Sequence, residues 1–159
     1  MKYIRLNNSE LESLRVDFIK FLAANTITAA DWVAIKKNDP MQAEQLIEHF
    51  SDLITERVLE ETTYLELIGK QQAQVIFCAQ KEMILLGAYG LPGSQVDFTA
   101  FSDVKDLLEF VIKSDQVKIL KGKRKFHADR NLEIFQEIQG GFKIVKESAL
   151  FQGLKFILK

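Results

Sequence analysis

The side chains of this chain that could bind an anion or a metal gather between Lys121 and Asn131, in the stretch KGKRKFHADRN. The stretch holds five cations, which are Lys121, Lys123, Arg124, Lys125 and Arg130. In an extended strand the three lysines would point to one face and Arg124 to the other. Phosphate groups attract clusters of this kind. The stretch therefore predicts a candidate site for a phosphoanion or a nucleic acid, or for the acidic surface of a protein partner.

The chain as a whole is not basic. Its net charge is −1 and its pI is ≈ 6.2, whereas dedicated nucleic-acid domains often have a pI above about 9. Single-strand binders also place exposed aromatic rings beside their cations, and only Phe126 lies nearby, where core packing is expected. Lysines are common on exposed sheet edges, where they block association. The main interpretation is therefore a solvated edge strand, with anion binding and an acidic protein partner as alternatives.

Two histidines, His49 and His127, raise the question of a metal site. Zinc takes about three or four protein ligands, and His127 has only Asp129 close in sequence. His49 shares a helix face with Asp52 and Glu56, but di-metal helical proteins draw carboxylates and Glu-x-x-His motifs from several helices. Both histidines are interpreted as surface residues. The sequence predicts no metal and no cofactor.

No catalytic residue is predicted either. The single cysteine, Cys78, lies in VIFCAQ, which is typical of a buried strand, whereas a reactive thiolate needs a partly exposed, electropositive setting. The chain contains no nucleophile elbow, phosphate-binding loop or dinucleotide-binding motif. An enzyme acting on a small molecule stays an alternative, and its pocket would be expected between helices and sheet.

Three helices are predicted before residue 62. Their starts are marked by capping residues, in chain order Ser9 with Glu12, Thr28, and Asp39 with Pro40. The first helix should end near Asn25. The second carries Trp32, whose ring is expected in the core. The third has the clearest apolar stripe and should end near Glu61.

After Thr62 the sequence changes to short apolar runs. Three of them predict an antiparallel meander, at Thr63–Ile68, Ala73–Ala79 and Met83–Tyr89. Further strands are expected at Gln95–Thr99, from Val117 toward Phe126, and at Phe142–Val145. Helices are expected after Ser102 and from about Ala128 to Gln139, the latter ending at two glycines. Residues 148–159 fit a helix or a strand, with a helix preferred.

These elements predict an α+β fold. An N-terminal helical half, about residues 9–61, would pack on an antiparallel sheet that shares about residues 63–159 with additional C-terminal helices. A chain of 159 residues is expected to form a single domain. One cysteine suits a reducing compartment, the N-terminus lacks the apolar run of a signal peptide, and no run reaches the roughly 20 residues of a membrane span. A cytoplasmic protein without membrane contact is expected.

Four short motifs are spread over nearly the whole chain: MKYIRL at Met1, ITAADW at Ile27–Trp32, FSDLI at Phe50–Ile54 and RNLEIFQEIQ at Arg130–Gln139. In these the chain resembles a domain-of-unknown-function family of small bacterial proteins, chiefly from the Bacteroidetes group. The resemblance implies a single soluble domain and assigns no activity to any residue.

The remaining positive signal is an uneven distribution of charge. Residues 1–120 carry 12 Lys/Arg against 18 Asp/Glu, whereas residues 121–159 carry 9 against 4. Surfaces of opposite charge attract one another. We therefore interpret the chain as a non-enzymatic protein-interaction or accessory domain. Its basic C-terminal surface is expected to bind the acidic surface of a second copy or of another protein.

Overall fold

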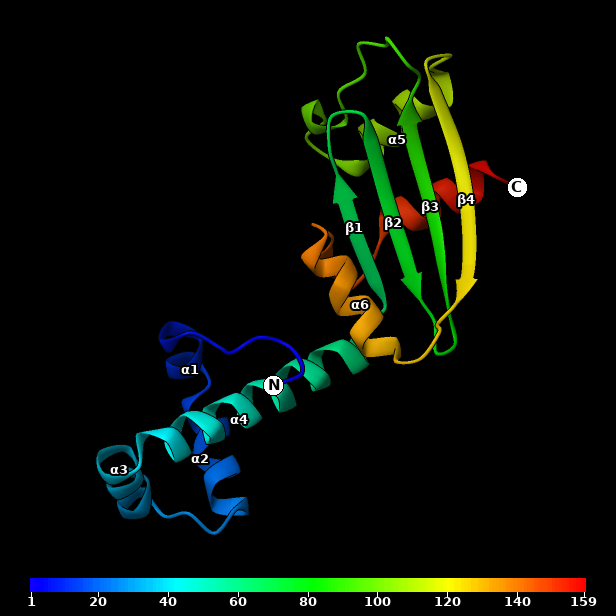
Figure 1. The fold of residues 1–159 in the computed structure, drawn as a ribbon. Coiled ribbons are helices and arrows are strands. Elements are labelled where there is room, and N and C mark those ends of the chain that lie inside the picture. Colours follow the sequence, from blue (N-terminus) through cyan, green and yellow to red (C-terminus); the bar gives the residue numbers. More distant parts are fainter. The chain divides into compact units, whose positions relative to one another are not determined.

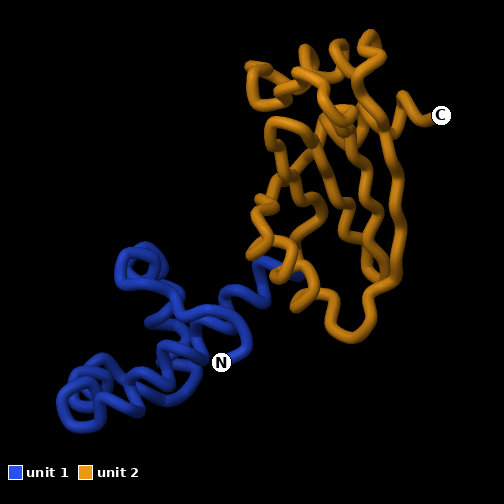
Figure 2. The backbone as a smooth tube through the Cα atoms, turned by 45° about the horizontal axis from the view of Figure 1, so that its top comes forward, with its two compact units in different colours: residues 1–60 blue, residues 61–159 orange.

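The computed structural model of the protein describes all 159 residues (Figure 1). The chain forms two compact units, residues 1–60 and residues 61–159 (Figure 2). The first unit is helical, and the second contains a five-stranded antiparallel sheet with helices on its faces. The predicted α+β class is therefore confirmed. The organisation as a single domain stays a prediction.

The helical unit is built around aromatic rings. Its helices are α1 (Asn8–Ser13), α2 (Arg15–Ala24), α3 (Ala29–Asn38) and α4 (Pro40–Glu61). The ring of Phe18 in α2 lies edge-on to that of Trp32 in α3, with centroids 5.2 Å apart, and 5.0 Å from that of Phe50 in α4. Trp32 thus packs with the core rings, as expected. The predicted starts of α3 and α4 are confirmed, because Thr28 and Asp39 accept hydrogen bonds from backbone N–H groups of the first turns.

The predicted start of the first helix is wrong. The capping box is formed by Asn7, whose side chain accepts from the Glu10 N–H at 2.8 Å, while the Glu10 carboxylate accepts from the Asn7 N–H at 2.7 Å. Ser9 lies inside α1, because an asparagine two residues earlier already satisfies the first turn. The helix is also not continuous to Asn25. Leu14, with ψ of 20°, separates α1 from α2.

No single helix is long and apolar enough to cross a membrane. Only α2 and α3 taken together, with a bend of 91° between them, meet that length and composition.

The sheet has the strand order β4-β3-β2-β1-β5, and all of its neighbouring pairs are antiparallel. Its strands are β1 (Tyr64–Ile68), β2 (Gln72–Cys78), β3 (Glu82–Gly90), β4 (Val117–Lys125) and β5 (Lys143–Val145). The predicted meander of the first three strands is confirmed. Register places Leu86 opposite Lys121 and Met83 opposite Arg124. Because opposed residues share a face and successive residues change face, this register decides which side chains of β4 lie together.

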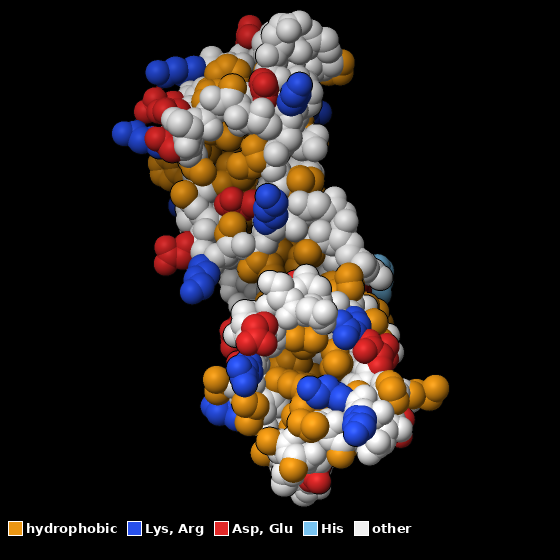
Figure 3. All heavy atoms as spheres, turned by 90° about the vertical axis from the view of Figure 1, so that its left-hand side faces the viewer, with side chains coloured by type: hydrophobic (Ala, Val, Ile, Leu, Met, Phe, Trp, Pro, Cys, Tyr) orange, Lys and Arg blue, Asp and Glu red, His pale blue; other side chains and the backbone are white.

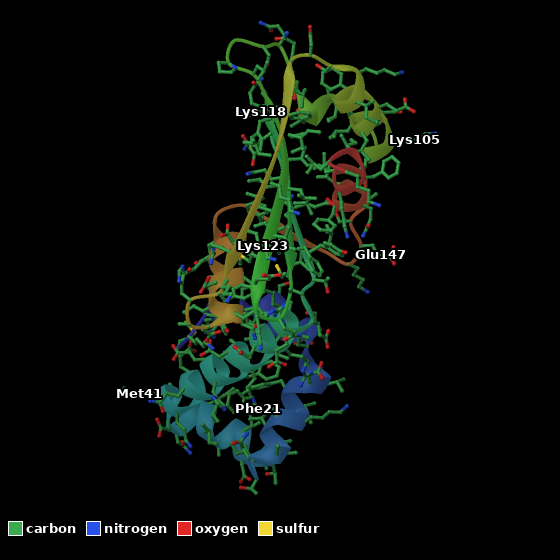
Figure 4. All side chains as sticks on the ribbon, turned by 90° about the vertical axis from the view of Figure 1, so that its right-hand side faces the viewer. Phe21, Met41, Lys105, Lys118, Lys123 and Glu147 are labelled. Atoms are coloured by element: carbon green, nitrogen blue, oxygen red, sulfur yellow. The ribbon has the colours of Figure 1, made fainter.

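Different helices cover the two faces of the sheet. Helices α5 (Val104–Lys113) and α7 (Ala149–Ile157) lie on one side, here named the α5–α7 face, and α6 (Arg130–Gln139) lies on the other, the α6 face (Figure 4). The main core on the α5–α7 face includes Val75, Leu86, Ala88, Phe98, Leu107, Leu150 and Leu154. Helices α5 and α7 approach closely at Gly153, where a Cβ would collide with Leu108. Only glycine permits that approach.

Three further expectations for this unit need correction. Residues 95–99 do not form a strand. Asp97 caps the short 3-10 helix η1 (Phe98–Ala100), and the Phe98 side chain is buried in the core. Helix α5 is capped by Asp103 and not by Ser102, and α6 begins at Arg130 with Asp129 as its cap. An aspartate directly before the first turn displaces the predicted start in both cases. The preferred helix near the C-terminus is confirmed, with Ser148 as the cap of α7.

Candidate functional site

The predicted basic residues lie on and after the edge strand β4. Lys121, Lys123 and Lys125 occupy alternate positions and project on the α5–α7 face, whereas Arg124 projects on the α6 face. Figure 4 views the sheet from this edge, and β4 runs along its front without a covering element. The three lysines are exposed. The edge therefore presents a row of cations to solvent.

The backbone of β4 also has an open side. The Phe126 N–H donates to the Lys81 carbonyl at 3.0 Å, and the Leu91 N–H donates to the Gln116 carbonyl at 2.8 Å. Since bonded and non-bonded pairs alternate in antiparallel sheets, the even-numbered residues of β4 bond to β3. The N–H and C=O groups of the odd-numbered residues point away from the sheet, where no other strand pairs. These residues are Val117, Ile119, Lys121, Lys123 and Lys125.

The lysines of this edge differ in whether they form an ion pair. The Lys123 ammonium lies 3.3 Å from the Glu82 carboxylate, in a pair whose lysine is 58% exposed. Exposed pairs of this kind contribute at most about 1 kcal/mol. Lys118, Lys121 and Lys125 form no ion pair. Their charges are available to a partner.

Arg124 is engaged within the chain. Its guanidinium donates to Glu133 at 2.5 Å and lies 3.8 Å from Glu137, both on α6. The Glu133 carboxylate also accepts from the backbone N–H groups of His127 and Ala128. These bonds close the turn between β4 and α6. The hydrogen bond from Arg124 is the main cause that lowers the pKa of Glu133 below its ordinary value.

Arg130 has a structural role of the same kind. Its guanidinium donates to the backbone carbonyls of Thr62, Cys78 and Ala79 at 2.8, 3.1 and 2.9 Å. One charged side chain thus joins the start of α6 to the end of β2 and to the connection between α4 and β1. The fold does not gather the five predicted cations into one cluster. It separates three edge lysines from two arginines with internal partners.

The two histidines lie on the surface, whereas the cysteine is buried. His49 and His127 are both exposed, and the ring of His49 lies 5.5 Å from that of Phe21. No group of three or more His, Cys, Asp or Glu side chains could hold a metal ion. Cys78 is 4% exposed, and burial raises the pKa of its thiol to about 11. That thiol is protonated near neutral pH, so it is not an activated nucleophile.

Sequence reasoning missed the contacts of the N-terminal segment, residues 1–6. The Asp52 carboxylate on α4 accepts from the backbone N–H groups of Lys2 and Tyr3 at 2.7 and 2.9 Å. Burial raises the pKa of Tyr3 to about 12, and its hydrogen bond to Glu56 acts in the same direction. The acids involved recur every fourth residue of α4, at Glu44, Glu48, Asp52 and Glu56. This helical spacing was the available signal.

The same segment neutralises much of that acidic stripe. Arg5 forms an ion pair with Glu44, and the Lys2 ammonium lies 3.2 Å from Glu56. The Leu6 N–H donates to the Ser51 hydroxyl at 3.0 Å, so backbone as well as side chains hold the segment on α4. The acidic stripe of α4 is therefore partly neutralised by cations of the N-terminal segment.

The helical unit also has an apolar groove with a volume of about 620 Å³. Helices α1, α2 and α3 line it, and Phe18 and Trp32 are among its lining residues. Ile19 and Val33 on its walls are 56% and 61% exposed. Figure 3 shows hydrophobic side chains open to solvent between charged ones over this unit. Charged residues of both signs line the groove, namely Glu12, Arg15 and Lys36. This mixture of charges does not indicate which kind of molecule would bind there.

Comparison with known proteins identifies a family, but no activity is assigned to that family. The model of a family described as "Family of unknown function (DUF6495)" matches residues 1–159. No curated protein and no solved structure matches the chain. The geometry of the site must therefore carry any functional argument.

Proposed function

The chain belongs to the DUF6495 family of unknown function, and from its geometry we propose that it is a cytoplasmic, non-enzymatic protein-interaction domain. Its β4 edge binds an extended acidic segment of another protein. One observation carries this proposal. The outward backbone groups of β4 coincide with exposed lysines at alternate positions, two of which, Lys121 and Lys125, form no ion pair.

Strand addition explains how such an edge binds. An added strand would exchange backbone hydrogen bonds with the odd-numbered residues of β4, and its alternate side chains would supply specificity. On the α5–α7 face those side chains would lie opposite Lys121, Lys123 and Lys125, and then opposite Val117 and Ile119. In antiparallel register the partner reads three acids at alternate positions, followed by two apolar residues at alternate positions. Alternate residues of a strand are about 7 Å apart, so the acid spacing matches the lysine spacing.

A nucleic acid or free phosphate fits the arrangement less well. Arg124 and Arg130, which could have bound phosphate through paired donors, are engaged with Glu133 and with backbone carbonyls. The remaining lysines form a row and do not converge on a point. Aromatic rings for base stacking are lacking along β4.

A second copy of this chain is also disfavoured as the partner. Two β4 edges paired with each other would place lysines near lysines, and like charges across a strand pair are destabilising. The acidic stripe of α4 already holds Lys2, Tyr3 and Arg5. No segment of the chain carries acids at three successive alternate positions. The edge lysines thus oppose self-pairing while they select an acidic strand.

The test uses a fluorescein-labelled peptide with three glutamates and then two valines at alternate positions, separated by threonines. Fluorescence anisotropy should show binding that weakens with added salt, and a peptide with lysines in place of the glutamates should not bind. The triple variant Lys121→Glu, Lys123→Glu, Lys125→Glu should lower the affinity at least about 100-fold. The matched control reverses the same number of exposed charges elsewhere, at Lys105, Lys146 and Lys155, and should leave the affinity unchanged.

Three outcomes would reject the proposal. They are no binding of the acidic peptide at low salt, equal loss of affinity in the control variant, and tighter binding of a thymidine oligonucleotide that the lysine variant abolishes. Light scattering across concentration provides the remaining check. If the protein forms a dimer and the triple variant is monomeric, the partner of the β4 edge is a second copy of the chain.

A further inference from the structure

A cavity of about 310 Å³ lies on the α6 face of the sheet, apart from the outer edge of β4. Its floor is formed by Ile76, Met83, Leu85 and Gly122, from three neighbouring strands. Glu137, in α6, and Phe142, after the end of that helix, also line it. Apolar walls with a few polar groups, at about this volume, are typical of small-molecule sites.

Two glycines of the α6 face differ in whether a side chain covers them. At Gly87 in β3, a Cβ would come within 2.5–2.6 Å of atoms of the Tyr89 side chain, because the Tyr89 ring lies over this glycine. Gly122 in β4 shares the same face, since Leu85 lies opposite it. A Cβ there would meet only the Leu85 Cβ, at 3.9 Å. The chain covers one glycine with an aromatic ring and leaves the other open.

This difference indicates the shape of an occupant. A glycine inside a strand weakens it, and it often marks a place where a ligand approaches the backbone. The ring over Gly87 demonstrates that a planar group fits on a glycine of this face. A ring of similar size over Gly122 would contact the Met83, Leu85 and Phe142 side chains that line the cavity.

The polar groups of the cavity indicate the charge of the occupant. Arg124 lines the wall, but its charge is directed to Glu133 at 2.5 Å. The Glu137 carboxylate lies 3.8 Å from Arg124, beyond hydrogen-bond distance, and is 34% exposed. Gln74 also lines the cavity, and its amide donates an N–H to the Tyr89 hydroxyl at 2.8 Å, which leaves its oxygen as an acceptor. The lining thus presents two acceptors to a donor.

We propose that this cavity binds a small aromatic amine, with its ring on Gly122 and its ammonium group at Glu137. Lys123 adds backbone to the lining, because its side chain projects on the opposite face of β4. The site is independent of the proposed partner edge. The backbone groups of Gly122, an even-numbered residue of β4, point toward β3 and not outward.

The test compares tryptamine with indole-3-acetate, which have the same ring and opposite charges. In protein carrying ¹³C-methyl methionine, Met83 reports on the cavity and Met41, exposed on α4, serves as internal reference. Tryptamine should shift the Met83 signal and leave the Met41 signal unchanged, and indole-3-acetate should shift neither. Glu137→Gln should weaken tryptamine binding about tenfold, because a charge-assisted hydrogen bond is lost.

Gly122→Val supplies the decisive variant. The added side chain enters open space in a strand that has an ordinary backbone conformation, so the fold is expected to be retained. This variant should lose tryptamine binding and still bind the acidic peptide at the β4 edge. An unshifted Met83 signal at millimolar tryptamine, a retained shift in Gly122→Val, or equal binding of indole-3-acetate would overturn the inference. Loss of peptide binding alone would reject the edge proposal and leave this one standing.

Discussion

The N-terminal segment and strand β4 both place cations on non-helical backbone, but β4 leaves some of its lysines outside any ion pair. Lys2 and Arg5 pair with Glu56 and Glu44, which lie on α4. Lys121 and Lys125 form no ion pair, although Glu82 lies opposite Lys125 in register. The same residue types thus stabilise the fold in one place and stay available to a partner in the other. The number of cations in a segment therefore does not by itself indicate a binding site.

The largest expected effect concerns Arg130, a cation with internal partners. Arg130→Ala should lower the free energy of unfolding by about 3 kcal/mol, because three backbone carbonyls lose a charged donor. Urea unfolding followed by circular dichroism measures this change. The matched variant Lys121→Ala on the exposed edge should change stability by less than about 0.5 kcal/mol. Equal effects for the two variants would remove the distinction between the two kinds of cation.

The next effect concerns the N-terminal segment. Asp52→Ala should lower the unfolding free energy of the helical unit by about 2 kcal/mol, since the carboxylate accepts from two backbone N–H groups. Trp32 is the only tryptophan, so its fluorescence reports on this unit alone. Glu48→Ala is the control, because Glu48 belongs to the same stripe and accepts no hydrogen bond. If both variants unfold alike, the segment is not held by the contacts described.

A smaller effect separates backbone from charge at the β4 edge. Lys121→Pro removes an outward N–H as well as the charge, whereas Lys121→Ala removes the charge only. Proline is tolerated on an edge strand when its position faces solvent. The proline variant should bind the acidic peptide about tenfold more weakly than the alanine variant, the loss expected for one or two backbone hydrogen bonds. Identical affinities would mean that the lysines attract the peptide without strand addition.

The smallest effect is a pH dependence at Glu133. Because its pKa is lowered in the folded state, chiefly by Arg124, its contribution to stability is present above the ordinary carboxyl pKa. That contribution is lost as the pH falls through the lowered value. Glu133→Gln should therefore reduce stability at neutral pH and flatten the further loss on acidification, measured by urea unfolding at several pH values. An unchanged acid profile would show that the Arg124 contact does not stabilise the fold.

Local signals account for the elements that were predicted well. Thr28 and Asp39 mark helix starts because a side-chain oxygen within three residues can satisfy the first turn. The meander at residues 63–89 follows from short apolar runs separated by polar turns, which need only neighbouring strands to pair. The errors at Ser9 and Ser102 have the same origin. A second capping residue stood close by, and local rules do not rank two good caps.

Local composition predicted the secondary structure poorly where the burial of one side chain determined it. Residues 95–99 carry a strand-like composition, but Phe98 is fully buried against α5 and the sheet, and the backbone follows it into a short helix. The candidate site was affected in the same way. Strand alternation already separated the three lysines from Arg124, but nothing local in the sequence showed that Arg124 and Arg130 are held by Glu133 and by backbone carbonyls.

The sequence by itself determined the α+β class, most element boundaries and the concentration of cations at Lys121–Arg130. Each depends on residues within a few positions of one another, where capping, periodicity and charge act directly. Only the tertiary structure decided which cations have partners within the chain, because Arg130 and Ala79 are 51 residues apart in sequence and Lys2 and Glu56 are 54 apart. It also decided that Gly87 is covered and Gly122 is open. Contacts of that range depend on the path of the whole chain, and no local pattern specifies them.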